Sequence, residues 1–526
     1  EPDNTAVGAY ALQVLVTGEN NTALGIAAGY RIDKGDNSTF LGHYAGYNAT
    51  GSYNTFVGKD AGKGGQASAP YSSGTHNVAL GYQALDAFTT GYQNVAVGSG
   101  AGGGLTTGYT STFVGYTAGA SVSTAGNNTY IGYAAGLAIT GAGNVGVGNH
   151  VMKAGSGAAA DNTAVGGGSL YAITSGEKNV AIGSAAGETL TTTDNTVLIG
   201  YQAGYAINST DANGTIAIGY QAGKAITHGL KNMAIGYQAL QSATANDYNT
   251  AIGYTALYSI SGSDGTEGEA NTAVGYRAGY STTTGGWNTF IGQDAGYGNT
   301  TGIYNNFIGA GAGQNNTTAN QSIYIGWYAA YYQQVGGNNV AIGHQTLYGA
   351  SGKANSASEN VAIGYQSAMG SDVGTGLTAV GSRALRNVSD SGSYSTAIGN
   401  YAGFHASGSY NTFVGSEAGK GGTTSAPFSS GENNVAVGYQ SLDAFTTGFR
   451  NVGVGKDTLG SLTTGQKNTA IGDEAFFTLD KGDYSVAVGA AAGYFATGSN
   501  NTFMGYEAGK GGTTSAPYSS GVNNTA

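Results

Sequence analysis

One short pattern recurs from end to end of this chain. An Asn-like residue is followed by three residues of alternating character, then by glycine, and then by a polar stretch rich in Thr and Gly. The pattern starts 30 times, and 17 of its 29 complete intervals are 17 residues long, the others running from 16 to 23. A fixed period of this length is typical of a solenoid, in which each unit stacks on the next. The insertions fall at one place in the unit, which is how a solenoid tolerates loops.

The unit can be interpreted as one narrow coil. In Val180-Ala181-Ile182 the two outer residues share one face. We assign that face to the interior, where we expect a ladder that includes Ile182, Ile235 and Ile342, and we expect the middle residue to point outward. The leading Asn suits a left-handed corner. The glycine is present in all 29 complete units, including Gly25, Gly183, Gly236 and Gly343, and we interpret it as a corner that needs positive φ or close backbone approach.

The sequence therefore predicts an all-β protein. We expect a parallel β-solenoid (β-roll) of about 29 coils, mostly 17 residues each, with two short strands per coil. No linker or change in composition interrupts the repeat, so residues 1–526 are interpreted as a single domain. The chain starts at Glu1 and stops within a unit. This favours a segment of a longer fibre, or ends that neighbouring subunits cover.

Large and small residues alternate between two positions of the unit. Nine units have an aromatic residue at the middle position, as at Phe40, and each has Gly or Ala six residues later, as at Gly46. Where the later residue is Leu, as at Leu85, the middle residue is Ala or Gly. Close-packed interiors demand such compensation. Because we assign the middle residue to the outside, this pattern predicts that several rolls pack side by side, three around one axis.

The repeat resembles two known groups of proteins. Asn-Val-Ala-Ile-Gly, at 179–183, 339–343 and 360–364, is similar to the repeat in the heads of trimeric autotransporter adhesins. The run from Asn249 to Tyr254 resembles repeats of bacteriophage tail fibres. The adhesin resemblance implies a left-handed parallel β-roll with three chains in one trunk. The period of 17 residues departs from the shorter unit of the adhesin heads.

Composition excludes several classes of function. The net charge is −11 with only 18 Lys and Arg, so no basic stripe is available for nucleic acid. There are no cysteines, and no apolar run approaches the length of a membrane span. The six histidines lack metal-ligand spacing. We therefore expect no metal, no cofactor and no enzymatic activity. Isolated Ca²⁺ at Asp or Asn corners, and a carboxylate pair in a groove between chains, remain alternatives.

Tyrosine is the most suggestive surface residue. Many of the 38 tyrosines directly follow the repeated glycine. These are Tyr82, Tyr116, Tyr133, Tyr201, Tyr220, Tyr237, Tyr254, Tyr276, Tyr365 and Tyr439. One per coil, they would form a ladder. Its rings can stack across coils and stabilise the sheet, or they can form a surface that binds a cell-surface glycan.

These observations favour a structural role outside the cell. We expect the shaft of a phage tail fibre or of a microbial surface adhesin, which gives reach, rigidity and multivalent attachment to a host or surface. The expected partners are further copies of the chain and a surface glycan, and the expected location is a virion tail or a cell surface. The alternatives are a subunit of an extracellular filament or sheath that assembles end to end, and a polysaccharide-degrading tailspike.

Overall fold

The computed structural model describes eight ranges of the chain. They are 3–65, 71–262, 267–351, 355–370, 374–388, 393–423, 428–512 and 520–526. Contacts divide the chain into two units, Glu1–Glu267 and Gly268–Ala526, and each unit is described by itself.

The described residues of the first unit form fifteen strands and one short 3-10 helix. The strands are β1 (Thr5–Val7), β2 (Thr22–Leu24), β3 (Thr39–Leu41), β4 (Thr55–Val57), β5 (Val78–Leu80), β6 (Val95–Val97), β7 (Thr112–Val114), β8 (Thr129–Ile131), β9 (Val145–Val147), β10 (Thr163–Val165), β11 (Val180–Ile182), β12 (Val197–Ile199), β13 (Ile216–Ile218), β14 (Met233–Ile235) and β15 (Thr250–Ile252). The helix, η1, spans Thr210–Ala212.

The second unit contains fourteen strands in its described residues. They are β16 (Thr272–Val274), β17 (Thr289–Ile291), β18 (Asn306–Ile308), β19 (Ile323–Ile325), β20 (Val340–Ile342), β21 (Val361–Ile363), β22 (Thr378–Val380), β23 (Thr396–Ile398), β24 (Thr412–Val414), β25 (Val435–Val437), β26 (Val452–Val454), β27 (Thr469–Ile471), β28 (Val486–Val488) and β29 (Thr502–Met504).

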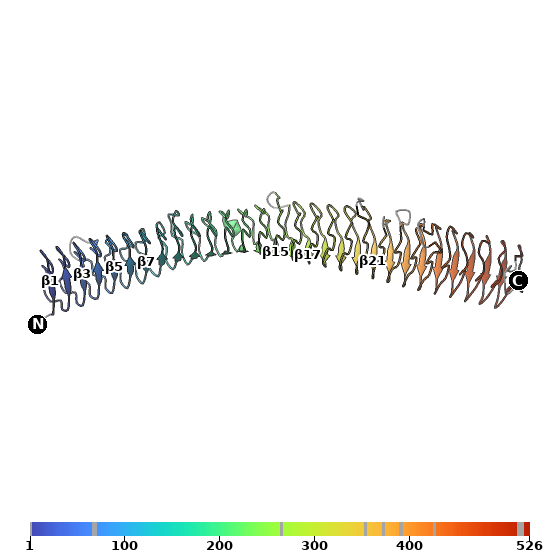
Figure 1. The fold of residues 1–526 in the computed structure, drawn as a ribbon, viewed down its shortest axis with the longest axis horizontal. Helices are drawn as coiled ribbons and strands as arrows, with labels where there is room; N and C mark the ends of the chain where they lie inside the picture. Colours follow the sequence, from blue (N-terminus) through green and yellow to red (C-terminus); the bar gives the residue numbers. More distant parts are fainter. Residues whose placement is uncertain are drawn as a thin grey trace. The chain divides into compact units, whose positions relative to one another are not determined.

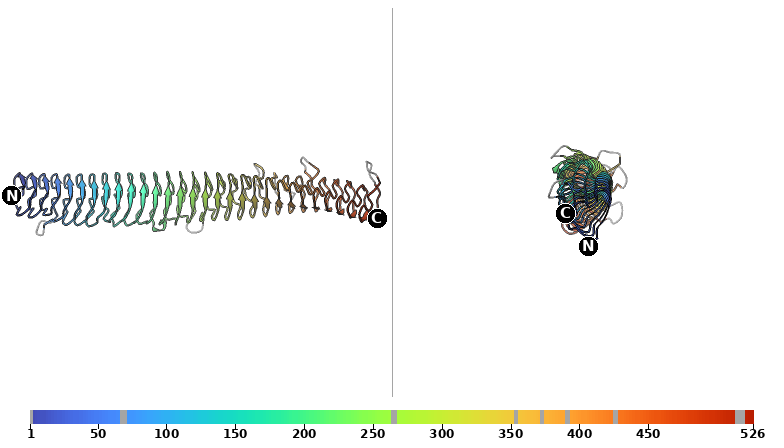
Figure 2. Two further views of the ribbon diagram at one scale, coloured as in Figure 1. Left: turned by 90° about the horizontal axis from the view of Figure 1, so that it is seen from below. Right: turned by 90° about the vertical axis from the view of Figure 1, so that its left-hand side faces the viewer.

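Within each unit, consecutive strands pair in parallel and in register. In β10 and β11, for example, Thr163, Ala164 and Val165 pair with Val180, Ala181 and Ile182. Figure 1 shows the strands of each unit side by side, and Figure 2 shows the loops of successive coils following one another. The predicted all-β parallel β-solenoid, with one strand for each predicted coil, is confirmed.

The predicted direction of the strand side chains was wrong. The middle residue of the strand is the buried one, because Ala181 is 0% exposed whereas Ile182 is 40% exposed. Ile235 and Ile342 are likewise half-exposed and lie on the outer face. The prediction placed the larger aliphatic residues inside because they are more hydrophobic than alanine. The coil is too narrow for a large side chain from every strand, so most of its interior positions hold alanine.

The compensation between large and small residues therefore takes place inside one chain. Phe40 is completely buried within its own coil, and a Cβ added to Gly46 would overlap its ring. Leu85, at the position that corresponds to Gly46, is also fully buried, and its coil has Ala79 in the middle of the strand. The pattern therefore does not support packing of several rolls, since the two positions face each other across one interior.

Each coil has one strand rather than the two predicted. After the corner glycine, two residues separated by one adopt left-handed backbone conformations, as at Gln83 (φ 55°) and Leu85 (φ 51°). Such an alternation produces turns and not an extended strand. Hydrogen bonds between coils continue on this side, because the Leu85 N–H donates to the Ala101 carbonyl at 3.0 Å.

The repeated glycine satisfies both conditions expected of it. Gly25 has φ of 137°, and a Cβ there would lie 2.6 Å from the carbonyl oxygen of Gly42 in the next coil. A side chain is therefore excluded by conformation and by space. The φ angles of the other named glycines are 134° at Gly183, 138° at Gly236 and 135° at Gly343.

The leading asparagines form a buried ladder. The Asn94 N–H donates to Oδ1 of Asn77 at 3.1 Å, and Asn94 Nδ2 donates to the carbonyl of Gly108 at 3.0 Å. Both asparagines are 0% exposed. The left-handed corner expected at this residue lies one position earlier, at Gln93 (φ 57°). Asparagine is favoured here because its amide satisfies backbone groups that water cannot reach.

Candidate interaction surface

The outer face of the strands is a broad uncharged surface. The first residue of each strand is Thr, Val, Ile, Met or Asn, and the third is Val, Ile, Leu or Met. Side chains such as Val78 and Leu80 are 39% and 46% exposed. We call this surface the outer strand face of each unit. It consists of the first and third residues of β1–β15 in the first unit and of β16–β29 in the second. Extended apolar surfaces of this kind mark contacts with other molecules.

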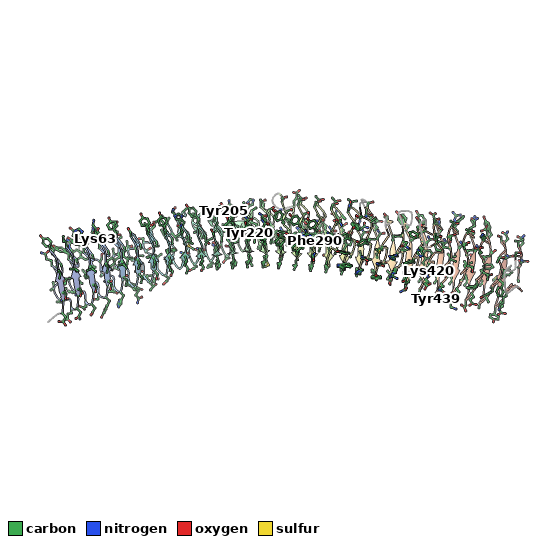
Figure 3. The ribbon with its side chains drawn as sticks, in the orientation of Figure 1. Lys63, Tyr205, Tyr220, Phe290, Lys420 and Tyr439 are labelled. Atoms are coloured by element: carbon green, nitrogen blue, oxygen red, sulfur yellow. The ribbon has the colours of Figure 1, made fainter. Side chains whose placement is uncertain are left out.

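Tyrosines border the outer strand face. Each of the ten predicted ladder tyrosines is exposed. In the first unit, the ring centroids of Tyr201, Tyr220, Tyr237 and Tyr254 are separated by 5.4, 5.1 and 5.0 Å, with interplanar angles of 18° or less. Tyr116 and Tyr133 stack at 5.4 Å. Figure 3 labels Tyr220 of this run and Tyr439 of the second unit, and also Phe290, which is completely buried.

The other predicted tyrosines have different neighbours. Lys59 Nζ lies 5.6 Å from the Tyr82 ring, and the Arg277 guanidinium lies 4.9 Å from the Tyr276 ring. Tyr365 contacts the His344 ring at 5.3 Å. Where the rings stack, their faces lie against one another, so edges and hydroxyls face outward. Such a run of stacked tyrosines stabilises the coils and forms an amphipathic edge beside the outer strand face.

A second row of aromatic rings was missed in the sequence. It occupies the position immediately before the unit start or, at Tyr92 and Tyr109, the position before that. The stacked pairs are Tyr92 with Tyr109, Trp287 with Tyr304 and Tyr394 with Tyr410, at 5.5, 5.4 and 5.6 Å. The signal was present, because an aromatic residue directly precedes the start of several units. The outer strand face is therefore bordered by rings on both sides.

Charged groups form small clusters on the turn side of the coil. Arg277 binds Asp294 of the next coil through two hydrogen bonds of 2.8 and 3.0 Å. Lys420 donates to Glu417 at 2.8 Å, and this bond, with another from Gln440, holds the pKa of Glu417 below its ordinary value. Burial raises the pKa of Asp443 to about 6. In the described ranges, no group of three His, Asp or Glu side chains could hold a metal ion.

Comparison with known proteins adds no family. No family model matches the chain, and no curated protein matches it. Among the residues that the structure describes, no helix is long and apolar enough to cross a membrane. The molecule is thus defined by its fold, a parallel β-solenoid repeat protein. That class is consistent with structural and adhesive repeat proteins.

Proposed function

We propose that the chain is the shaft of an extracellular fibre, on a phage tail or a microbial surface, and that it works as a homotrimer. One observation carries the proposal: the outer strand face is uncharged, has an apolar third residue in every strand and is bordered by tyrosines in each unit. Interface cores are depleted of charge and enriched in aromatic residues. The proposed role is mechanical and adhesive rather than enzymatic.

The period of the face favours a copy of the same chain as the partner. Neighbouring parallel strands repeat about every 4.8 Å, and the outer strand face repeats with them. A second chain aligned in parallel matches this period at every coil, whereas an irregular surface matches it at few. Three copies are proposed because the Asn-Val-Ala-Ile-Gly repeat resembles that of the trimeric adhesin heads.

The proposed attachment to a surface depends on the repetition of the same coil along the chain. A shaft that presents the same surface feature on many coils and on three chains engages a surface at many points. Linked weak contacts raise the overall affinity without any new contact. The proposed function is therefore reach combined with multivalent attachment.

The test is the mass of the particle in solution. We expect light scattering to give three times the chain mass of 52.2 kDa. Replacement of Ile182, Ile199 and Ile218 with lysine places three charges on the outer strand face. This variant should be a folded monomer, because an unpaired charge is costly in an interface core.

A matched variant carries lysines at Ser175, Thr192 and Asn195, which lie at corners of the coil of Ile182 and of the coil before it. It should remain trimeric, since Lys178 and Lys231 occupy corners naturally. A parent chain that stays monomeric as its concentration rises would contradict the proposal. Mass that grows without limit would favour the end-to-end filament.

A further inference from the structure

Four aromatic residues cross the surface of a single coil in the second unit. They are Trp327, Tyr328, Tyr331 and Tyr332, which follow β19. Ring centroids lie 4.1 Å apart between Trp327 and Tyr328, 4.6 Å between Tyr328 and Tyr331, and 4.6 Å between Tyr331 and Tyr332. Tyr348 of the next coil extends the group, at 5.2 Å from Tyr332. We call these five residues the aromatic band.

The aromatic band combines stacked and perpendicular rings. Trp327 stacks on Tyr328 at 26°, and Tyr331 stacks on Tyr348 at 14°. Tyr332 is nearly perpendicular to Tyr331, at 88°, and to Tyr348, at 84°. Perpendicular rings do not cover each other's faces as stacked rings do. Trp327 is 46% exposed, and Tyr331, Tyr332 and Tyr348 are half-exposed. Parts of all four side chains are therefore accessible along the band.

A shallow hollow adjoins the band. It has a volume of about 250 Å³, and Tyr348, Met369, Arg386 and Asn387 line it. The Arg386 guanidinium donates to Oε1 of Gln366 at 3.2 Å and to Oδ1 of Asn387 at 3.4 Å, and it lies 5.6 Å from the Phe404 ring. These contacts in the described part of the chain are with neutral groups. They hold the guanidinium in place through neutral acceptors and one aromatic ring.

We propose that the aromatic band and this hollow bind an acidic oligosaccharide. Aromatic ring faces contact the C–H faces of pyranose rings, and the tyrosine hydroxyls exchange hydrogen bonds with sugar hydroxyls. Arg386 supplies paired donors for a sugar carboxylate. The proposal deepens the adhesive role proposed above and rests on it, because it names the class of surface ligand and one site for it.

The geometry favours a sugar over a protein partner. A protein partner would need a wide apolar surface, whereas the band is two coils wide and ends at a polar hollow. Few exposed rings with a small number of placed polar groups are the features of a small-ligand site. The positive charge of Arg386 beside the band favours a carboxylated sugar over a neutral one.

The experiment uses the tryptophan of the band as the reporter. The chain has two tryptophans, so Trp287→Phe leaves Trp327 as the sole tryptophan, which is excited selectively at wavelengths where tyrosine does not absorb. This full-length protein is titrated with hexagalacturonate, a hyaluronan hexasaccharide and sialyllactose, and with cellohexaose as the neutral sugar. We expect a saturable change in fluorescence with at least one acidic sugar, and an affinity for cellohexaose lower by about tenfold or more.

Three variants locate the site. Arg386→Gln, and the pair Tyr332→Ser with Tyr348→Ser, should each weaken binding of the acidic sugar by about tenfold or more. Tyr297→Ser should leave the affinity unchanged. Tyr297 stands at the position of Tyr331 two coils earlier, and it stacks on Tyr280 at 5.2 Å. Arg386→Gln removes the charge and the guanidinium contacts but no core side chain, so it tests the site even if the tyrosine pair impairs folding.

Three results would overturn the inference. They are a flat response to all three acidic sugars, equal affinity for cellohexaose, and equal affinity of the parent and the Arg386→Gln variant. Binding of a protein through the band in place of these sugars would overturn it too. Light scattering on the same samples separates the two proposals, because these substitutions lie away from the outer strand face and should leave a trimer intact.

Discussion

Side-chain volume at two facing positions governs the interior of each coil. Phe413 is fully buried, and Gly419 lies so close to it that a Cβ would overlap the ring. In the next coil the corresponding residues are Ala436 and Leu442, also buried. Leu442 has φ of 54° and Gly419 has φ of 56°, so the same backbone accepts either residue. The choice between glycine and leucine therefore depends on volume and not on conformation.

This interpretation predicts strong coupling between the two positions. Phe413→Ala should destabilise the second unit by about 3 kcal/mol through the cavity it leaves. Gly419→Leu should cost a similar amount by overpacking. The double variant should recover most of the loss, because it recreates the Ala436 and Leu442 pair. Thermal and urea unfolding of the four proteins measure this coupling, and strictly additive losses would contradict it.

The asparagine ladder gives a second prediction. Asn94→Ala leaves the buried N–H of Ser111 and the carbonyl of Gly108 without their partners, and it should cost about 2 kcal/mol. Asn94→Ser should cost less. Serine occupies the ladder naturally at Ser111, where its Oγ accepts from the Asn128 N–H at 3.2 Å. Hydrogen exchange of the flanking coils would report both effects. Equal protection in the two variants would argue against the ladder.

At the scale of the element, successive coils share one strand and one pairing register, so we expect that one coil can replace another. The period located the strands, because Val180-Ala181-Ile182 is a strand where the repeat predicts one. The repeat did not reveal which face of the strand is buried. Both faces are apolar, and a narrow coil reverses the usual preference for large residues inside. The aromatic band was also hidden, since contacts between Tyr332 and Tyr348 of different coils depend on side-chain orientation.

Deletion of a whole coil should be tolerated. Removal of 232–248 joins the coil of Ala217 and Gly223 to that of Ala251 and Leu257. In the parent chain, Gly223 is hydrogen-bonded to the coil that contains Leu240. Leu257 occupies the same buried position in the coil after that one. We expect thermal unfolding within a few degrees of the parent. Removal of 232–240 alone should abolish the cooperative transition of the first unit, because it breaks the register. Equal behaviour of the two deletions would contradict this view of the coil.

Across the whole molecule, charge is scarce and its sign is unbalanced. The net charge is −11, and acidic groups occupy turns and corners. Burial raises the pKa of Asp443 from 3.8 to about 6, so its ionised form destabilises the folded chain at neutral pH. Glu417 has the opposite behaviour, because its bond to Lys420 lowers its pKa. As the pH falls, Asp443 is protonated before Glu417, so the unfavourable buried charge is removed before the bond between Glu417 and Lys420 is lost.

The stability of the second unit should therefore depend on pH in a defined window. Because the pKa of Asp443 is raised in the folded state, its favourable contribution is complete below 3.8 and is lost as pH rises through about 6. Asp443→Asn should stabilise the unit at pH 7 by about 1 kcal/mol, a value reduced for partial solvent screening. The gain should disappear near pH 4. Urea unfolding at both pH values measures it, and a gain independent of pH would exclude this origin.

The single strand per coil has a mechanical consequence. Hydrogen bonds between coils join each strand to the next, so tension applied between the ends of a unit loads the coils in series. One coil can then detach while its neighbours stay folded. A 17-residue coil releases at most about 60 Å of extended chain. A shaft made of such coils would lengthen in small steps under a sudden pull and dissipate energy, where a globular domain would give way in one event.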